Sequence, residues 1–160
     1  MNTIEIKVKI KLCQPDELTK TEQTLIQKAI EATGTSYAKY SNFKVGASAL
    51  LSDGTIVTGS NQENASYPVG LCAERITVFA ANSQYPDKPI TTLCIAAKNE
   101  KNILLSKPVT PCGACRQVIL EEEQRYNHPV KLLLYGTDGT YVVDRIEDIL
   151  PLAFIDKSMG

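Results

Sequence analysis

The segment FKVGASALLSDGTIVT, residues 43–58, decides the fold of this chain. Two runs suited to β-strands, residues 43–51 and 55–58, are joined by Ser-Asp-Gly at 52–54. A short connection containing Asp-Gly between two such runs is typical of a β-hairpin. We therefore expect two antiparallel strands here.

The residues around this hairpin switch between helical and strand periodicity. A helical pattern follows Pro15, with Asp16 near its start and Gly34 just past its end. Further helices are expected at 72–82, 112–124 and 145–150, with buried strands at 90–97 and 130–135 and a strand at 141–143 after a turn at 138–139. This order predicts a single α/β domain over residues 1–160, a three-layer α/β/α sandwich with a mixed sheet.

The first residues carry a pattern of their own. Apolar residues at positions 4, 6, 8, 10 and 12 alternate with Glu5, Lys7, Lys9 and Lys11. A period of two indicates a strand with one apolar and one wet face. We expect residues 1–14 to be an N-terminal extension that forms an edge strand.

Composition and charge restrict the possible partners. A chain of 160 residues buries about 70% of its unfolded surface, so it forms a core without disulfides. Its 17 basic and 18 acidic residues leave a net charge of −1, which disfavours a nucleic-acid partner. No apolar run is long enough for a membrane span, and the first residues lack the apolar core of a signal peptide. We expect a cytoplasmic protein with no membrane partner.

The five cysteines indicate a metal site more than a disulfide framework, because their number is odd and no export signal is seen. Cys72 opens one expected helix, and Cys112 and Cys115 open another. Helix starts lower thiol pKa values and so favour the thiolates that metals bind. Three thiolates fill three corners of a tetrahedron and leave one for water, as in catalytic zinc sites. Cys13 and Cys94 are interpreted as small buried apolar residues, and His128 as a surface residue.

Two charged residues follow Cys72. A carboxylate such as Glu74 often only stabilises a helix start, but beside a zinc-activated water it is the group that moves protons. Residues two apart diverge on a helix, so Glu74 shares a site with Cys72 only if Cys72 stands at the very start. We expect Arg75 to donate to a thiolate, while Arg116 is equally well an ordinary surface residue.

Several segments resemble the cytidine deaminase family, in its small form with three cysteine ligands. LCAER at 71–75 and PCGACRQ at 111–117 match both halves of the zinc-deaminase signature, with cysteine in place of histidine. The similarity extends through YSNFKVGA at 40–47, NQENASYP at 61–68 and LPLAF at 150–154. Gln62 departs from the family, where this position is usually apolar, which affects only the expected local packing.

The resemblance implies a role for each matching position. One zinc ion per subunit would be held by Cys72, Cys112 and Cys115, with Glu74 as the proton shuttle. Asn61 and Glu63 would bind ribose hydroxyls, Phe43 would line the pyrimidine pocket, and the backbone at Ala73 would contact the base. In a homotetramer, Ala65, Tyr67 and Phe154 would reach a neighbouring subunit's pocket.

The function implied is zinc-dependent hydrolytic deamination of cytidine and deoxycytidine in pyrimidine salvage. One alternative is deamination of a blasticidin-type nucleoside antibiotic, although Asn61 and Glu63 favour an ordinary sugar. Deamination of a nucleotide or polynucleotide is disfavoured, because Glu63 stands where a phosphate would need basic residues. A structural zinc site or a redox Cys-x-x-Cys in a noncatalytic protein is the remaining alternative.

Overall fold

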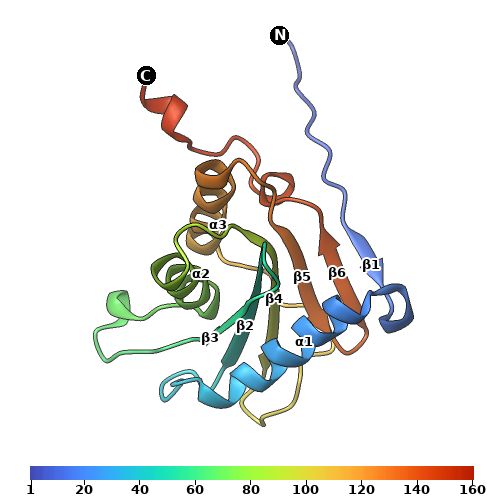
Figure 1. Ribbon diagram of the computed structural model, residues 1–160, viewed down its shortest axis with the longest axis vertical. Helices are drawn as coiled ribbons and strands as arrows, with labels where there is room; N and C mark the ends of the chain where they lie inside the picture. Colours follow the sequence, from blue (N-terminus) through green and yellow to red (C-terminus); the bar gives the residue numbers. More distant parts are fainter.

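The computed structural model describes residues 1–160 as one six-stranded sheet with helices on both faces (Figure 1). The strands are β1 (Lys11–Cys13), β2 (Lys44–Leu51), β3 (Ile56–Ser60), β4 (Ile90–Lys98), β5 (Lys131–Gly136) and β6 (Gly139–Val143). Their order across the sheet is β1-β6-β5-β4-β2-β3. Only β4 and β5 pair in parallel, so the sheet is mixed, as the sequence predicts.

The expected hairpin is confirmed in β2 and β3, which pair antiparallel. Its turn is closed by the backbone N–H of Gly54, which donates to the carbonyl of Leu51 at 2.9 Å. Gly54 has a φ of +90°, a conformation that glycine adopts at little cost. The Asp53 side chain accepts from the N–H of Thr55 at 3.0 Å and so fixes the same turn.

The α-helices are α1 (Lys20–Ala32), α2 (Ala73–Gln84) and α3 (Gly113–Tyr126). The first begins later than Asp16 suggests, because Thr19 caps it: its Oγ1 accepts from the N–H of Glu22 at 3.2 Å, while the Glu22 carboxylate accepts from the N–H of Thr19 at 2.8 Å. The expected last helix is a 3-10 helix over Ile146–Ile149. None of the helices has both the length and the apolar sequence that crossing a bilayer requires.

Strand β4 shows how the two faces of the sheet are used. Leu93 and Ile95 point to one face, where they join the core cluster that includes α2 and α3 side chains. Cys94 and Ala96 point to the other face, against α1. The helices therefore cover both faces, α1 on one side and α2 with α3 on the other (Figure 1). This is the predicted three-layer sandwich.

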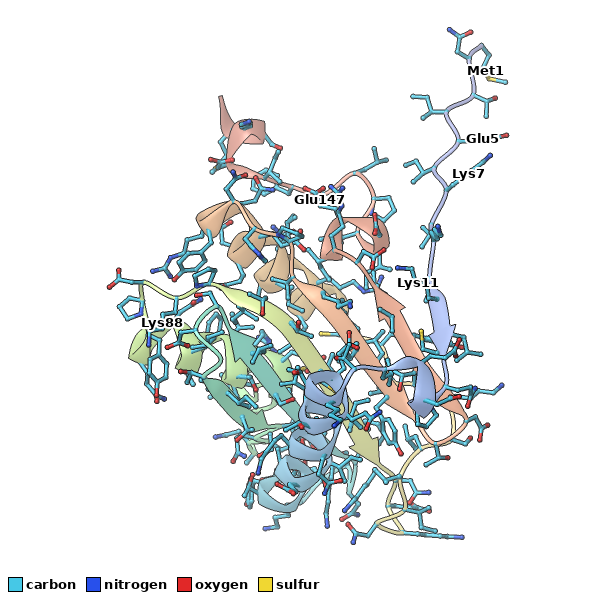
Figure 2. All side chains as sticks on the ribbon, turned by 45° about the vertical axis from the view of Figure 1, so that its right-hand side comes forward. Met1, Glu5, Lys7, Lys11, Lys88 and Glu147 are labelled. Atoms are coloured by element: carbon cyan, nitrogen blue, oxygen red, sulfur yellow. The ribbon has the colours of Figure 1, made fainter.

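The N-terminal strand is much shorter than the alternation over residues 4–12 indicates. Strand β1 covers only Lys11–Cys13, which pair with Val142, Tyr141 and Thr140 of β6. Residues 1–10 have no regular secondary structure and extend away from the body of the protein (Figure 2). This register sets Ile10 opposite Val143, the last residue of β6, so β6 offers no strand backbone to residues 1–9.

Candidate active site and metal centre

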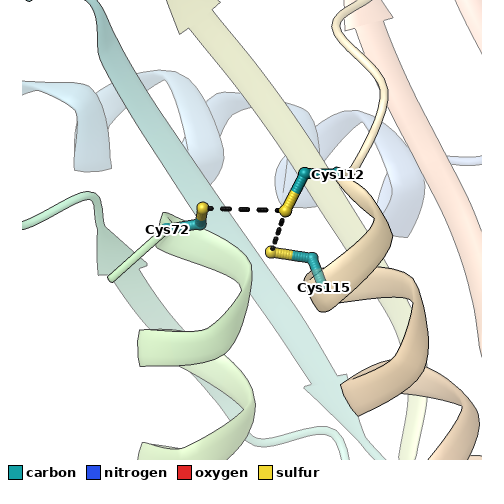
Figure 3. A group of neighbouring side chains, drawn as sticks. All are labelled: Cys72, Cys112 and Cys115. Carbon is teal, nitrogen blue, oxygen red and sulfur yellow. Dashed lines mark hydrogen bonds between the residues drawn. The ribbon is translucent and has the colours of Figure 1, made fainter. Parts of the chain in front are cut away.

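Three cysteine side chains meet where α2 and α3 begin (Figure 3). The Sγ atom of Cys112 lies 4.0 Å from that of Cys72 and 3.5 Å from that of Cys115, and all three sulfurs lie within 4.8 Å of one another. A tetrahedral zinc ion with Zn–S bonds of about 2.3 Å needs sulfurs about 3.8 Å apart. The thiols thus fit zinc with only small adjustments.

The start of each helix places these thiols. Cys72 and Cys112 have extended backbones as the N-cap residues of α2 and α3. Their carbonyls accept the first intrahelical bonds, from the N–H of Ile76 at 3.1 Å and of Arg116 at 2.9 Å. Cys72 therefore stands at the very start of its helix, which is the condition for Glu74 to share its site.

Arg75 lies against the thiol cluster. Its Nη2 is 3.8 Å from Sγ of Cys72, and its Nε is buried without a partner. A hydrogen bond from the Cys115 thiol, with a second from Arg75, lowers the pKa of Cys72 to about 5. The bond to Cys72 raises the pKa of Cys115 in turn. Cys72 is thus a thiolate at neutral pH, the form that binds a metal.

Glu74 is a buried carboxyl group in the first turn of α2, only 5% exposed. It lines the same cavity as Cys72 and Cys112. Burial raises the pKa of Glu74 to about 7, and the nearby charge of Cys72 acts in the same direction. A carboxyl group of this kind both accepts and donates a proton near neutral pH.

The cavity has a volume of about 600 Å³, within the range of small-molecule sites. It joins Cys72, Cys112 and Glu74 to four residues that the sequence singled out, which are Phe43, Asn61, Glu63 and Tyr67. Half of its 16 lining residues are hydrophobic and the others are polar or small, which suits a ligand with both a flat ring and hydroxyl groups.

Asn61 holds the start of β2 in place. Its Oδ1 accepts from the backbone N–H of Val45 at 2.9 Å, and its Nδ2 donates to the carbonyl of Phe43 at 2.8 Å. An asparagine amide has two N–H donors and two acceptor positions. One donor and one acceptor position of Asn61 therefore remain for a ligand.

Glu63 is held by the loop before β2. Its carboxylate accepts from the backbone N–H of Tyr40 at 2.7 Å, from that of Ser41 at 3.3 Å and from the Ser41 hydroxyl. The hydrogen bond from that hydroxyl, more than any other contact, lowers the pKa of Glu63. Glu63 is therefore ionised and prepared to accept a further hydroxyl group.

The segment that carries Asn61 and Glu63 is tied to the metal centre through Gln62. The N–H of Gln62 donates to the carbonyl of Leu71 at 2.9 Å, and the N–H of Leu71 returns the bond at 3.0 Å. Leu71 directly precedes Cys72. The Gln62 side chain donates to Oγ of Ser60 at 3.1 Å, which accommodates a polar residue here.

Three of the other predicted contact residues, Ala65, Ala73 and Phe154, lie outside the lining, whereas Tyr67 belongs to it. Ala73 is fully buried, so only its backbone is available to a ligand. Tyr67 lies in the cavity of its own chain, edge-on to Tyr40 with ring centroids 5.6 Å apart. Ala65 is exposed, and Phe154 is 60% exposed near the end of the chain.

The remaining cysteines and the histidine stay apart from the thiol cluster. Cys94 is fully buried, as predicted, but Cys13 is only half-buried because it sits on the edge strand. His128 is exposed. Ser41 was not predicted to belong to the site, although its segment was singled out, and the role of Arg116 was left open. Arg116 donates to the carbonyls of Pro111 at 2.9 Å and Ile149 at 2.7 Å, which fixes the start of α3.

A buried glutamate beside a three-thiol zinc site on this sandwich defines the class of zinc-dependent deaminases. Residues 19–126 match the family described as the cytidine and deoxycytidylate deaminase zinc-binding region, and the chain belongs to that family. The family match and the thiol cluster together confirm zinc as the cofactor.

Individual relatives agree with this assignment. The chain is 36% identical over 138 residues to the cytidine deaminase of Halalkalibacterium halodurans, and the match covers 86% of this chain and 97% of that protein. It is 38% identical over 129 residues to the cytidine deaminase of Mycobacterium tuberculosis, and this match covers 79% of this chain and 84% of that protein. The crystal structure of cytidine deaminase from Burkholderia pseudomallei superposes with a TM-score of 0.71 at 35% identity, covering 86% of this chain and all of that one.

Proposed function

We propose that this chain hydrolyses cytidine and deoxycytidine to uridine and deoxyuridine with release of ammonia, as an enzyme of pyrimidine salvage. The observation that carries the proposal is the single cavity that joins Glu74 and two of the three clustered thiols to Asn61 and Glu63. The relatives named as cytidine deaminases support it.

Glu74 moves the protons in this reaction. A zinc ion held by Cys72, Cys112 and Cys115 supplies the Lewis acid that makes water nucleophilic near neutral pH. Glu74 accepts the proton that the attacking water loses and delivers it to N3 of the base. It then takes the proton of the new hydroxyl group on C4 and passes it to the exocyclic amine, so that the C4–N bond breaks and ammonia leaves. Cytidine and water thus become uridine and ammonia, and Glu74 returns to its starting state.

The sugar and the base are held by opposite parts of the cavity. The free N–H of Asn61 donates to a ribose hydroxyl, and the remaining acceptor position of Glu63 accepts a hydrogen bond from a ribose hydroxyl. The ring of Phe43 packs against the pyrimidine. The backbone N–H of Ala73, in the first turn of α2, has no intrahelical partner and donates to the base.

The working unit in this proposal is a homotetramer, in which Ala65, Tyr67 and Phe154 help to form a neighbour's pocket. In its favour, Tyr67 is 73% exposed and Phe154 is 60% exposed, unusual for large aromatic side chains. Size-exclusion chromatography with light scattering measures the mass of the assembly, which should be four times the chain mass of 17.5 kDa. A monomer with full activity would contradict shared pockets.

The proposed location is the cytoplasm, because the exposed thiol of Cys112 must stay reduced to bind zinc. Cell fractionation with an antibody to the chain tests this placement. Recovery with a cytoplasmic marker is the expected result, and recovery with exported proteins would contradict it.

The experiment that tests the function follows the ultraviolet absorbance of cytidine, deoxycytidine, CMP and cytosine with zinc-loaded protein. The expected result is turnover of both nucleosides but not of CMP or free cytosine, because Asn61 and Glu63 bind the sugar and Glu63 repels a phosphate. Turnover of CMP would overturn the nucleoside assignment. If the protein converts none of the four compounds but converts blasticidin-type nucleosides, its substrate is a nucleoside antibiotic. If the zinc-loaded protein converts none of these compounds, the proposal that it is a deaminase is contradicted.

A further inference from the structure

The N-terminal residues 4–10 form an arm that the active site does not use. The arm precedes the family match, which begins at residue 19. It is extended and leaves the body of the protein beyond Lys11 (Figure 2). Ile4, Ile6, Val8 and Ile10 are between 46% and 86% exposed along it. The arm thus combines a strand-like sequence with an exposed apolar face.

No other part of the chain pairs with this arm. Residues 1–10 make no backbone–backbone hydrogen bond, and Glu5, Lys7 and Lys9 form no ion pair. Strand β6, the only neighbour of β1, ends at Val143. An exposed, apolar strand with free backbone groups is a template for pairing with another chain.

We propose that residues 4–10 pair antiparallel with the same residues of a second copy of this chain. A two-fold axis at Lys7 brings all four apolar side chains of each arm to one face and all charged ones to the other. The pairs are Ile4 with Ile10, Glu5 with Lys9, Ile6 with Val8, and Lys7 with its counterpart.

Apolar pairing and charge together select this register. Glu5 meets Lys9 twice, and only one pair of like charges remains, at position 7. An axis at Ile6 would pair Glu5 with Lys7 twice and leave no like charges, but it would set Ile10 of each arm against the polar Asn2 and so lose apolar pairs. Moving the axis to Val8 would set Lys7 against Lys9 twice. That shift would also draw in Lys11, which already binds both carboxylate oxygens of Asp144 at 3.0 and 2.9 Å. In a parallel, in-register pair every charged residue would face its like.

The arm pairing is independent of the proposed catalytic function, since no arm residue lines the cavity. An isolated two-stranded ribbon is marginal in water, so the pair is best captured covalently. Opposite residues in an antiparallel pair have Cα atoms about 4.5–5.5 Å apart, within the range that a disulfide bridges. Position 7 is the one place where a single introduced cysteine would meet itself.

The test is oxidative cross-linking of the zinc-loaded Lys7→Cys variant, with Glu5→Cys and Lys9→Cys as matched controls. In the proposed register the two copies of residue 5 lie about 13 Å apart along the strands, too far for a disulfide. Lys7→Cys should therefore give at least tenfold more covalent dimer than either control alone. An equal mixture of Glu5→Cys and Lys9→Cys should cross-link again, through position 5 of one copy and position 9 of the other.

Peptide mass spectrometry identifies the disulfide, and deaminase activity shows that each variant is folded. Equal cross-linking at positions 5, 7 and 9 would mean random collision of arms and would overturn the proposal. Absence of cross-linking at position 7 in a folded, zinc-loaded protein would also overturn it. A heterologous protein captured at position 7, in place of a second copy, would assign the arm to another partner.

Discussion

The sulfur atom of Cys72 lies 4.0 Å from that of Cys112, although the two residues are forty positions apart and begin different helices. This contact requires α2 and α3 to start side by side on the same face of the sheet (Figure 3). Cys115 then completes the cluster from the first turn of α3. The metal centre is therefore built by helix packing, with each thiol at a helix start.

Removing one of the three clustered thiols should greatly weaken zinc binding. In Cys112→Ala, two thiols remain, and zinc affinity should fall by more than about a hundredfold. Zinc content per chain, measured by plasma mass spectrometry after dialysis, checks this. Cys13→Ala is the matched control and should retain zinc, because Cys13 lies outside the cluster. Equal zinc in both variants would contradict the assigned ligands.

Arg75 should strengthen zinc binding through its contact with Cys72. Arg75→Gln is expected to weaken zinc affinity by about 10–100-fold, the usual effect of removing a partner of a metal ligand. Competition with a coloured chelator measures the change. Arg125→Gln serves as the control, since Arg125 stacks on Tyr126 and touches no ligand. The same affinity in both variants would leave Arg75 without the proposed role.

Ser41 should support sugar binding by holding the Glu63 carboxylate. Losing one such hydrogen bond costs about 1 kcal/mol, so Ser41→Ala should raise KM for cytidine about fivefold. The value of kcat should change little, because Glu74 and the thiols are untouched. Steady-state kinetics checks this against Ser52→Ala in the hairpin turn, which should match the unsubstituted enzyme. A large fall in kcat with unchanged KM would argue against a sugar-side role.

The close contact between β2 and α1 makes Gly46 essential to the fold. A Cβ atom at position 46 would lie 2.1 Å from the carbonyl oxygen of Ala29 and 2.7 Å from the backbone nitrogen of Thr33. Gly46→Ala should lower the free energy of unfolding by about 3 kcal/mol or more. Gly34→Ala, where a Cβ meets nothing within 4 Å, should change it by less than about 0.5 kcal/mol. Urea unfolding midpoints compare the two, and equal midpoints would contradict this packing.

Local sequence signals predicted the parts of the structure that depend on neighbouring residues. The Asp53-Gly54 turn fixed the hairpin, and the motifs around Cys72 and Cys112 placed both helix starts. Features set by tertiary contacts were less accessible. The length of β1 depends on where β6 ends, at Val143, which the alternation in the first residues cannot reveal.

In the site, too, features set by neighbouring residues were predicted and features set by tertiary contacts were not. The spacing of Cys112 and Cys115 predicted their convergence, because residues three apart share a helix face. The bond between Ser41 and Glu63 joins residues 22 positions apart, and no periodic pattern indicates it. The start of α1 was misplaced because Asp16 and Thr19 are both good N-cap residues, and the capping box with Glu22 selects Thr19.

The central claim is that zinc and Glu74 together perform the deamination. It is tested most directly by measuring kcat/KM for cytidine and zinc content in the same preparation of Glu74→Gln. This variant keeps the size of the side chain but cannot carry a proton. We expect full zinc occupancy with kcat/KM reduced by about a thousandfold or more. Full zinc occupancy with activity within tenfold of the unsubstituted enzyme would contradict it.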